Sequence, residues 1–177
     1  MGFIFSIGGI LFVNYLDDTI KSAKDIETDG ELNFLGHVME LDKKTRKLIF
    51  HMDPKHPFNE SIRSIRNNIN HAFSNKMLKS IVVTSHFDLE GKSFFAANLA
   101  VSLANEGKKV LIVDGDLRKS GIWNYFGLPR GAGLTDYLLG NSEFESVLCK
   151  TDIEGLHIIL SGSVPHDPAK LVETDNL

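Results

Sequence analysis

The sequence predicts an α/β domain in which helices flank a parallel sheet. Two apolar runs, residues 81–84 and 110–113, have the length and β-branched content of buried strands. Between them, Phe95, Leu99 and Leu103 recur at helical intervals. A strand, a helix and a second parallel strand form a right-handed crossover, which would set the two strands side by side. The length of 177 residues fits one domain of moderate size.

A phosphate-binding loop is predicted where the first strand meets the helix. The unpaired N–H groups and the dipole at a helix start favour a bound anion. In the run Glu90–Ser93, Gly91 permits close backbone approach, Lys92 would reach the β- and γ-phosphates, and the serine hydroxyl would ligate magnesium. The strict pattern G-x-x-x-x-G-K-[ST] fails, because its first glycine falls at His86. A Gly-Lys-Ser tripeptide alone occurs by chance, so the interpretation depends on its surroundings.

Paired carboxylates follow the second strand and supply those surroundings. Asp114 and Asp116 would lie at the carboxyl edge of a strand, where ligands bind in open α/β sheets. Magnesium prefers one or two carboxylates together with phosphate oxygens. Arg118 could steady a phosphate or pair with the acids. An isolated Asp-x-Asp is more often a solvated turn, but one crossover away from Lys92 the pair favours a magnesium–nucleotide site.

Residues 81–172 resemble the cytoplasmic domain of the bacterial tyrosine kinases that regulate capsule and exopolysaccharide export. The resemblance covers 90–93, 97–100, 114–119, 133–140 and 161–171. It implies a P-loop NTPase-type domain that uses ATP and Mg²⁺ to phosphorylate tyrosines of a neighbouring copy. The residues implied at the nucleotide are Glu90, Gly91, Lys92, Ser93, Phe94 and Arg118. Those implied at the metal are Ser93, Asp114 and Asp116, and the implied catalytic residues are Lys92, Asp114 and Asp116, one of the two acids taking the tyrosine proton.

The loop departs from the pattern of that family, which usually has Pro-Gly where this chain has Asp88-Leu89. Asp88 puts a negative charge near bound phosphates, and Leu89 lacks the freedom of glycine at positive φ. We therefore expect weaker nucleotide binding or a different loop path.

Two other functions stay open. A partition-type ATPase shares the fold but has a second loop lysine where this chain has Phe87; a non-catalytic membrane adaptor would keep the fold without binding nucleotide.

A further helix is predicted from Pro57, with isoleucines at helical intervals along it. Glu60, Arg63 and Arg66 would stand together beside this apolar stripe. Taken alone, the three residues are a solvated face with a weak Glu–Arg pair. The resembled family uses Glu-x-x-Arg-x-x-Arg to close its subunits into a ring, so the resemblance implies a homo-oligomer interface here.

The amino terminus is predicted to be the inner part of a transmembrane helix. Residues 2–13 are almost wholly apolar, yet shorter than the roughly 20 residues that span a bilayer. A signal peptide would need basic residues before the run, and a buried core helix also fits the length. Fused members of the family continue from a membrane helix into sequence like residues 15–21. The resemblance thus implies three parts: a membrane segment (1–16), a juxtamembrane connector (17–56) and the first portion of a kinase domain (57–177).

The resemblance also implies a location and partners. The kinase region would lie on the cytoplasmic side of the inner membrane and work with the polysaccharide polymerisation and export machinery. With 23 acidic and 19 basic residues, the chain has no overall basic field for nucleic acid. Its one cysteine suits a reducing compartment.

Two expectations concern the carboxyl-terminal half. Core packing is expected for Trp123, Tyr125 and Phe126, with a contact to the nucleotide base as the alternative. After a strand at 156–160, the family continues into another aspartate-bearing strand and a tyrosine-rich tail. We therefore expect Leu177 to end a fragment that is truncated at its carboxyl end, has an open apolar sheet edge and is inactive alone.

Overall fold

The computed structural model describes residues 7, 8, 12, 15–17, 33–41, 48, 55–73, 80–168 and 171. The chain divides into two units, residues 1–35 and 36–177. In the first unit, residues 7, 8, 12 and 15 are helical, and the rest of the predicted membrane segment 1–16 lies outside the described residues. Among the described residues, no helix has the length and apolar character needed to cross a membrane.

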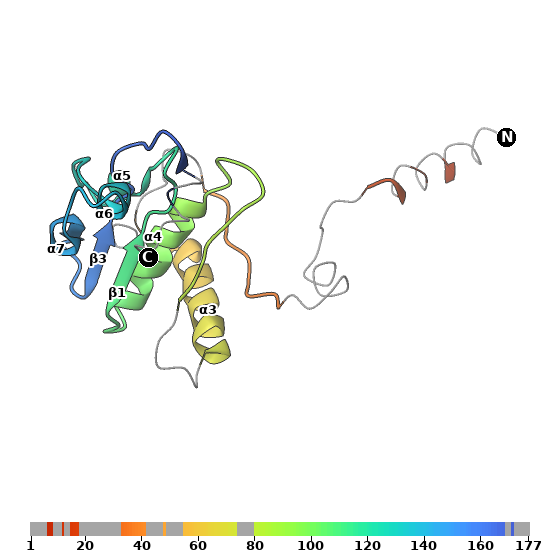
Figure 1. Cartoon of the computed structure of the whole chain (residues 1–177). Coiled ribbons are helices and arrows are strands. Elements are labelled where there is room, and N and C mark those ends of the chain that lie inside the picture. The colour runs from red at the N-terminus through yellow and green to blue at the C-terminus, as the bar shows by residue number, and fades with distance from the viewer. Residues whose placement is uncertain are drawn as a thin grey trace. The chain divides into compact units, whose positions relative to one another are not determined.

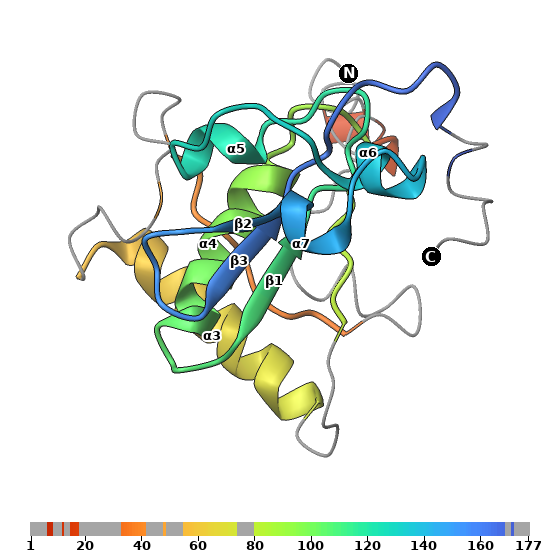
Figure 2. The ribbon, with the colours of Figure 1, turned by 60° about the vertical axis from the view of Figure 1, so that its left-hand side comes forward.

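The second unit is a small sheet with helices packed on it (Figure 1). Its sheet has the order β1-β3-β2, and α4 packs on the sheet while α3 packs on α4. The elements α5 and α6 lie beyond the arrowheads of β1 and β3 (Figure 2). The bounds are α3 Pro57–Ala72, α4 Lys92–Ala104, β1 Val110–Val113, α5 Ile122–Tyr125, α6 Leu134–Leu138, α7 Phe144–Val147, β2 Leu148–Lys150 and β3 Leu156–Ile159.

The sheet is mixed, which corrects the predicted parallel sheet. The strands β1 and β3 are parallel, as predicted, but β2 pairs with β3 in the antiparallel direction. The two strands of that pair are joined by the turn at residues 151–155. So short a connection allows only antiparallel pairing, because parallel neighbours need a crossover of a dozen or more residues.

The predicted strand at 81–84 is not formed, and this prediction is wrong. Residues 80–85 carry no strand pairing, and Ile81 and Val82 are 40% and 87% exposed. A strand needs a neighbour to satisfy its backbone N–H and C=O groups, and within the described residues β1 pairs with β3 alone. Of the predicted strand–helix–strand crossover, the described residues therefore form the helix α4 and the second strand β1.

The helix α4 is apolar on two sides because it lies between the sheet and α3. Small residues, among them Ala97, Ala100 and Val101, join the core cluster that contains strand residues of β1 and β3. On the other side, Leu99 packs with Ile65 of α3. A helix enclosed in this way needs no polar face, which explains its many buried positions.

Arg66 links α3 to α4. Its Nη1 donates to the carbonyl oxygen and the hydroxyl of Ser102, at 3.2 and 3.0 Å, and its Nη2 lies 2.8 Å from Oε1 of Glu106. The Arg66 side chain is only 14% exposed. Arg63 instead pairs with Glu60 along the helix surface, and those side chains are 43% and 64% exposed. Of the predicted interface trio, Glu60 and Arg63 are therefore the members that remain at the surface.

We predict that Arg66→Ala destabilises the fold while Arg63→Ala does not. Losing charge-assisted hydrogen bonds to Ser102 and Glu106 should lower the free energy of unfolding by about 1.5–3 kcal/mol. Losing the exposed pair with Glu60 should change it by about 0.5 kcal/mol or less. Urea unfolding of both variants measures this difference. Equal effects of the two substitutions would contradict the anchoring role of Arg66.

Candidate functional site

The predicted phosphate loop turns into α4 through two residues with positive φ. Gly91 precedes the helix with φ 94°, as the close-approach role of that glycine requires. Leu89 has φ 66°, the left-handed conformation that a β-carbon disfavours. Its side chain is 91% exposed, so no packing compensates this strain. The expectation that this position suits glycine is confirmed in the backbone conformation.

Both carboxylates of the loop have partners. Oε2 of Glu90 accepts a hydrogen bond from the amide of Phe87 at 3.2 Å. Oδ2 of Asp88 lies 2.5 Å from Nζ of Lys119, which belongs to the acid block after β1. The hydrogen bond and charge of Lys119, with a smaller contribution from Lys92, lower the pKa of Asp88. The same pairing raises the pKa of Lys119. The negative charge expected to disturb phosphate binding is thus balanced within the protein.

The ion pair between Asp88 and Lys119 also joins the two halves of the predicted site. It connects the loop before α4 with the turn after β1, although the residues are far apart in sequence. Lys92 and Ser93 open α4 and are half-buried, whereas Arg118 is exposed. The structure therefore brings a residue of the phosphate loop into contact with a residue of the acid block.

The two aspartates of the acid block have different environments. Asp114 is buried at 6% exposure, and its amide bonds the carbonyl of Ile159 at 2.9 Å. Its Oδ2 accepts from the Ser120 hydroxyl at 2.7 Å, and its Oδ1 accepts from the amide of Asp116 at 3.2 Å. Asp116 is half-buried and its Oδ1 accepts from the amide of Lys119 at 2.9 Å. Asp114 is the rigidly held carboxylate, and Asp116 is the more accessible one.

Phe94 lies in the core rather than at a site surface. It is 7% exposed, and its ring centroid lies 5.1 Å from that of Phe58 and 6.0 Å from that of Tyr125. Its ring is therefore occupied with packing, and a nucleotide contact from this residue would have to come from its backbone. Core packing is also what the structure shows for Trp123, Tyr125 and Phe126, which border the main core cluster.

Asp136 is a structural residue that the sequence reasoning missed. Its Oδ2 accepts from the amides of Gly133 and Ser163, at 2.9 and 3.2 Å, and its Oδ1 accepts from the Ser163 hydroxyl at 2.7 Å. Burial raises the pKa of this carboxyl, but the hydrogen bonds from Ser163 and Gly133 outweigh burial and leave it lowered. A β-carbon on Gly133 would lie 2.1 Å from the carbonyl oxygen of Leu160, so only glycine fits there. The glycine beside an acid in the 133–140 block was the available signal.

Known proteins share this sequence and fold. No family model matches the chain. The chain is 40% identical over 129 residues to tyrosine-protein kinase YwqD of Bacillus subtilis, covering 73% of this chain and 54% of that protein. The putative tyrosine-protein kinase EpsB of Ralstonia nicotianae is 32% identical over 184 residues, which cover 97% of this chain and 24% of that protein. The crystal structure of the chimerical protein CapA2B2 matches with a TM-score of 0.77 and 39% identity, covering 88% of this chain and 66% of that one. The chain belongs to the bacterial tyrosine kinases.

Membership in the bacterial tyrosine kinases confirms the family predicted from the sequence. A second solved structure, described as the BceF tyrosine kinase domain, matches with a TM-score of 0.77 at 29% identity. The chain spans about half the length of YwqD, and 55% of the putative tyrosine-protein kinase CapB of Staphylococcus aureus. The matched bacterial tyrosine kinases are therefore longer than the part compared with this chain.

We predict that Leu89→Gly stabilises the protein. A residue with a β-carbon in the left-handed conformation is destabilised by roughly 1–2 kcal/mol. Replacing it with glycine removes this strain, but glycine loses more backbone entropy on folding, which offsets roughly 0.5–1 kcal/mol of the gain. The free energy of unfolding should rise by about 0.5–1 kcal/mol in urea denaturation. Leu139→Gly is the matched control, because Leu139 is also exposed but has φ −78°. A loss of stability in Leu89→Gly equal to that of the control would contradict the strain.

We also predict that Asp136 makes the free energy of unfolding decrease as the pH falls. Its folded pKa lies below the ordinary value of 3.8, so its contribution is complete above that value and is lost as the pH falls through the folded pKa. Asp136→Asn should be less stable than the native chain at neutral pH, and the gap should narrow on acidification. Urea midpoints between neutral and acid pH measure it, with the exposed Asp152→Asn as control. A gap that stays constant with pH would contradict the assignment.

Proposed function

We propose that this chain is the nucleotide-binding portion of an ATP- and Mg²⁺-dependent protein-tyrosine kinase that phosphorylates tyrosines of a neighbouring copy. One observation carries the proposal. The ion pair of Asp88 with Lys119 connects a Gly-Lys-Ser loop with an Asp-x-Asp block, in a chain 40% identical to a named tyrosine kinase. Loop and acids are the two parts that phosphoryl transfer needs, because the reaction depends on positioning and charge neutralisation.

The donor groups suit a magnesium–phosphate complex. Magnesium is held through hard oxygen ligands, typically one or two carboxylates besides phosphate oxygens and water. Asp114, Asp116 and the hydroxyl of Ser93 offer oxygens of this kind. Within the described residues no group of three or more His, Cys, Asp or Glu side chains converges. Bound magnesium would neutralise phosphate charge at this place.

The roles of the other residues follow from their positions. The amides around Gly91 and the ammonium group of Lys92 would hold the phosphates and balance the charge that develops during transfer. A phenol has a pKa of about 10, so a nearby carboxylate is needed to take its proton at neutral pH. We assign this role to Asp116, because Asp114 is buried and already bonded to Ser120 and to the Asp116 amide.

The assembly and the membrane attachment belong to the same proposal. The exposed Glu60 and Arg63 on α3 are suited to meet a neighbouring copy in a ring, while Arg66 supports them from within. The first 16 residues would anchor the chain in the inner membrane, with the kinase region on the cytoplasmic side beside the polysaccharide export machinery. Support for this part is the sequence resemblance and the match of 97% of the chain to EpsB.

Phosphoryl transfer to an added acceptor tests the activity. We would incubate the chain with γ-labelled ATP, Mg²⁺ and a tyrosine-containing copolymer as the acceptor. Lys92→Ala and Asp114→Asn should lower tyrosine labelling by about 10²-fold or more, because each removes charge stabilisation in the transition state. The exposed Lys108→Ala should leave labelling unchanged.

The same assay separates the rival functions. Release of inorganic phosphate without labelled tyrosine would contradict the kinase and favour a partition-type ATPase. Failure to bind ATP in equilibrium dialysis would contradict both enzymes and favour a non-catalytic adaptor.

A further inference from the structure

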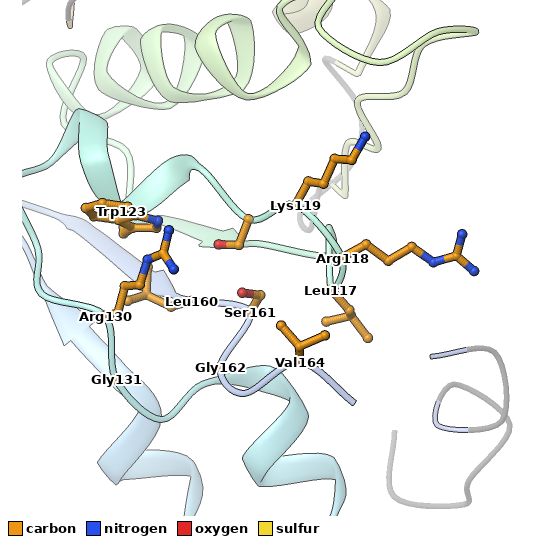
Figure 3. A pocket seen from close by; sticks show the side chains of 11 residues that line it. Leu117, Arg118, Lys119, Trp123, Arg130, Gly131, Leu160, Ser161, Gly162 and Val164 are labelled. Atoms are coloured by element: carbon orange, nitrogen blue, oxygen red, sulfur yellow. The ribbon is translucent and has the colours of Figure 1, made fainter. Parts of the chain in front are cut away.

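A small pocket lies between the turns that follow β1 and β3 (Figure 3). The carboxyl ends of parallel strands are where open α/β sheets bind ligands. The pocket has a volume of about 140 Å³, close to the roughly 150 Å³ cavity that accepts one benzene ring and below the roughly 300 Å³ of the smallest typical ligand sites. Among the residues that line it are Leu117, Ser120, Trp123, Arg130, Leu160 and Ser161.

One buried hydrogen-bond donor at this pocket lacks an acceptor. The indole Nε1 of Trp123 is buried and has no hydrogen-bond partner among the described residues. Ser161 also lines the pocket, and its hydroxyl makes no hydrogen bond within the described part of the chain. An unsatisfied buried donor costs about 1–3 kcal/mol, so such groups in native structures call for an explanation such as a bound water or ion.

The charge at the pocket is positive. The guanidinium of Arg130 lies 4.7 Å from the centre of the Trp123 ring, which keeps it at the pocket by a cation–π contact. No carboxylate is among the described lining residues. The side chains of Arg118 and Lys119 point away from Trp123 in Figure 3, and Lys119 instead binds Asp88. A guanidinium and two unpartnered donors therefore face one small space.

We propose that this pocket binds phosphate, as the free ion or as a phosphate monoester. A tetrahedral oxyanion offers several acceptor oxygens to Trp123, Arg130 and Ser161, which line the same pocket, and a guanidinium fork matches two of them. The apolar side chains of Leu117 and Leu160 suit the carbon stem of a monoester. The site is distinct from the phosphate loop and does not require the chain to transfer phosphoryl groups.

The tryptophan content makes the test direct, because Trp123 is the one tryptophan of the chain. Titration of the full chain with sodium phosphate, without nucleotide and at constant ionic strength, should give a saturable change in its emission. Arg130→Gln should weaken phosphate binding by about tenfold or more, and Ser161→Ala several-fold. Arg63→Gln, an exposed arginine on α3, should bind as the native chain does. Trp123→Phe removes both the N–H donor and the fluorophore, so phosphate binding to this variant is measured by calorimetry.

The remaining experiments decide whether the bound phosphate is the free ion or a monoester, and whether this site is independent of the phosphate loop. Phenyl phosphate binding more tightly than inorganic phosphate supports a monoester, and equal binding supports the free ion. Lys92→Ala should abolish ATP binding and leave phosphate affinity unchanged, which separates this inference from the proposed function. The proposal is overturned if the tryptophan emission does not saturate with phosphate or if acetate binds more tightly than phosphate. It is also overturned if Lys92→Ala loses phosphate binding. It is also overturned if folded Arg130→Gln, verified by circular dichroism, binds phosphate normally.

Discussion

The parallel pairing of β1 with β3 is the constraint on which the rest of the structure depends. Val113 lies opposite Ile159, and the amide of Asp114 bonds the carbonyl of Ile159, so both strands end at the same level. The turns that follow, residues 114–120 and 160–163, must then lie beside each other. The buried acid and the pocket both result from this alignment, because one turn supplies the carboxylate and both turns contribute to the pocket walls.

A second set of bonds fixes the turn after β3. The amides of Leu134 and Thr135 at the start of α6 donate to the carbonyls of Leu160 and Ser161, at 2.7 and 2.9 Å. The missing side chain of Gly133 allows this close approach, and Asp136 then gathers the neighbouring amides. The start of α6 and residues 160–163 therefore form one structural unit, which the resemblance of each segment to a family could not reveal.

Periodicity predicted those elements whose partners lie within the sheet and its helices. The helix from Pro57, the helix after Gly91 and the strands before Asp114 and at 156–159 are present. Periodicity names the apolar face of an element but not its neighbour. For that reason the apolar run at 81–84 predicted a strand, but this segment has no strand partner among the described residues. Arg66 similarly shares a sequence pattern with Arg63, yet only Arg66 reaches Ser102 on the next helix and Glu106 just beyond its end.

The departure at Asp88 shows why a motif has to be judged together with its surroundings. On sequence alone, a carboxylate in a phosphate loop repels the ligand. In the structure, Lys119 from the acid block lies 2.5 Å away and balances it. Both side chains are more than half exposed, at 64% for Asp88 and 72% for Lys119, so solvent screens the pair and it adds little to stability. Its consequence is local: Lys119 offsets the negative charge of Asp88 and connects the loop with the turn that carries Asp114 and Asp116. The residue that breaks the family pattern is thereby part of the contact between loop and turn.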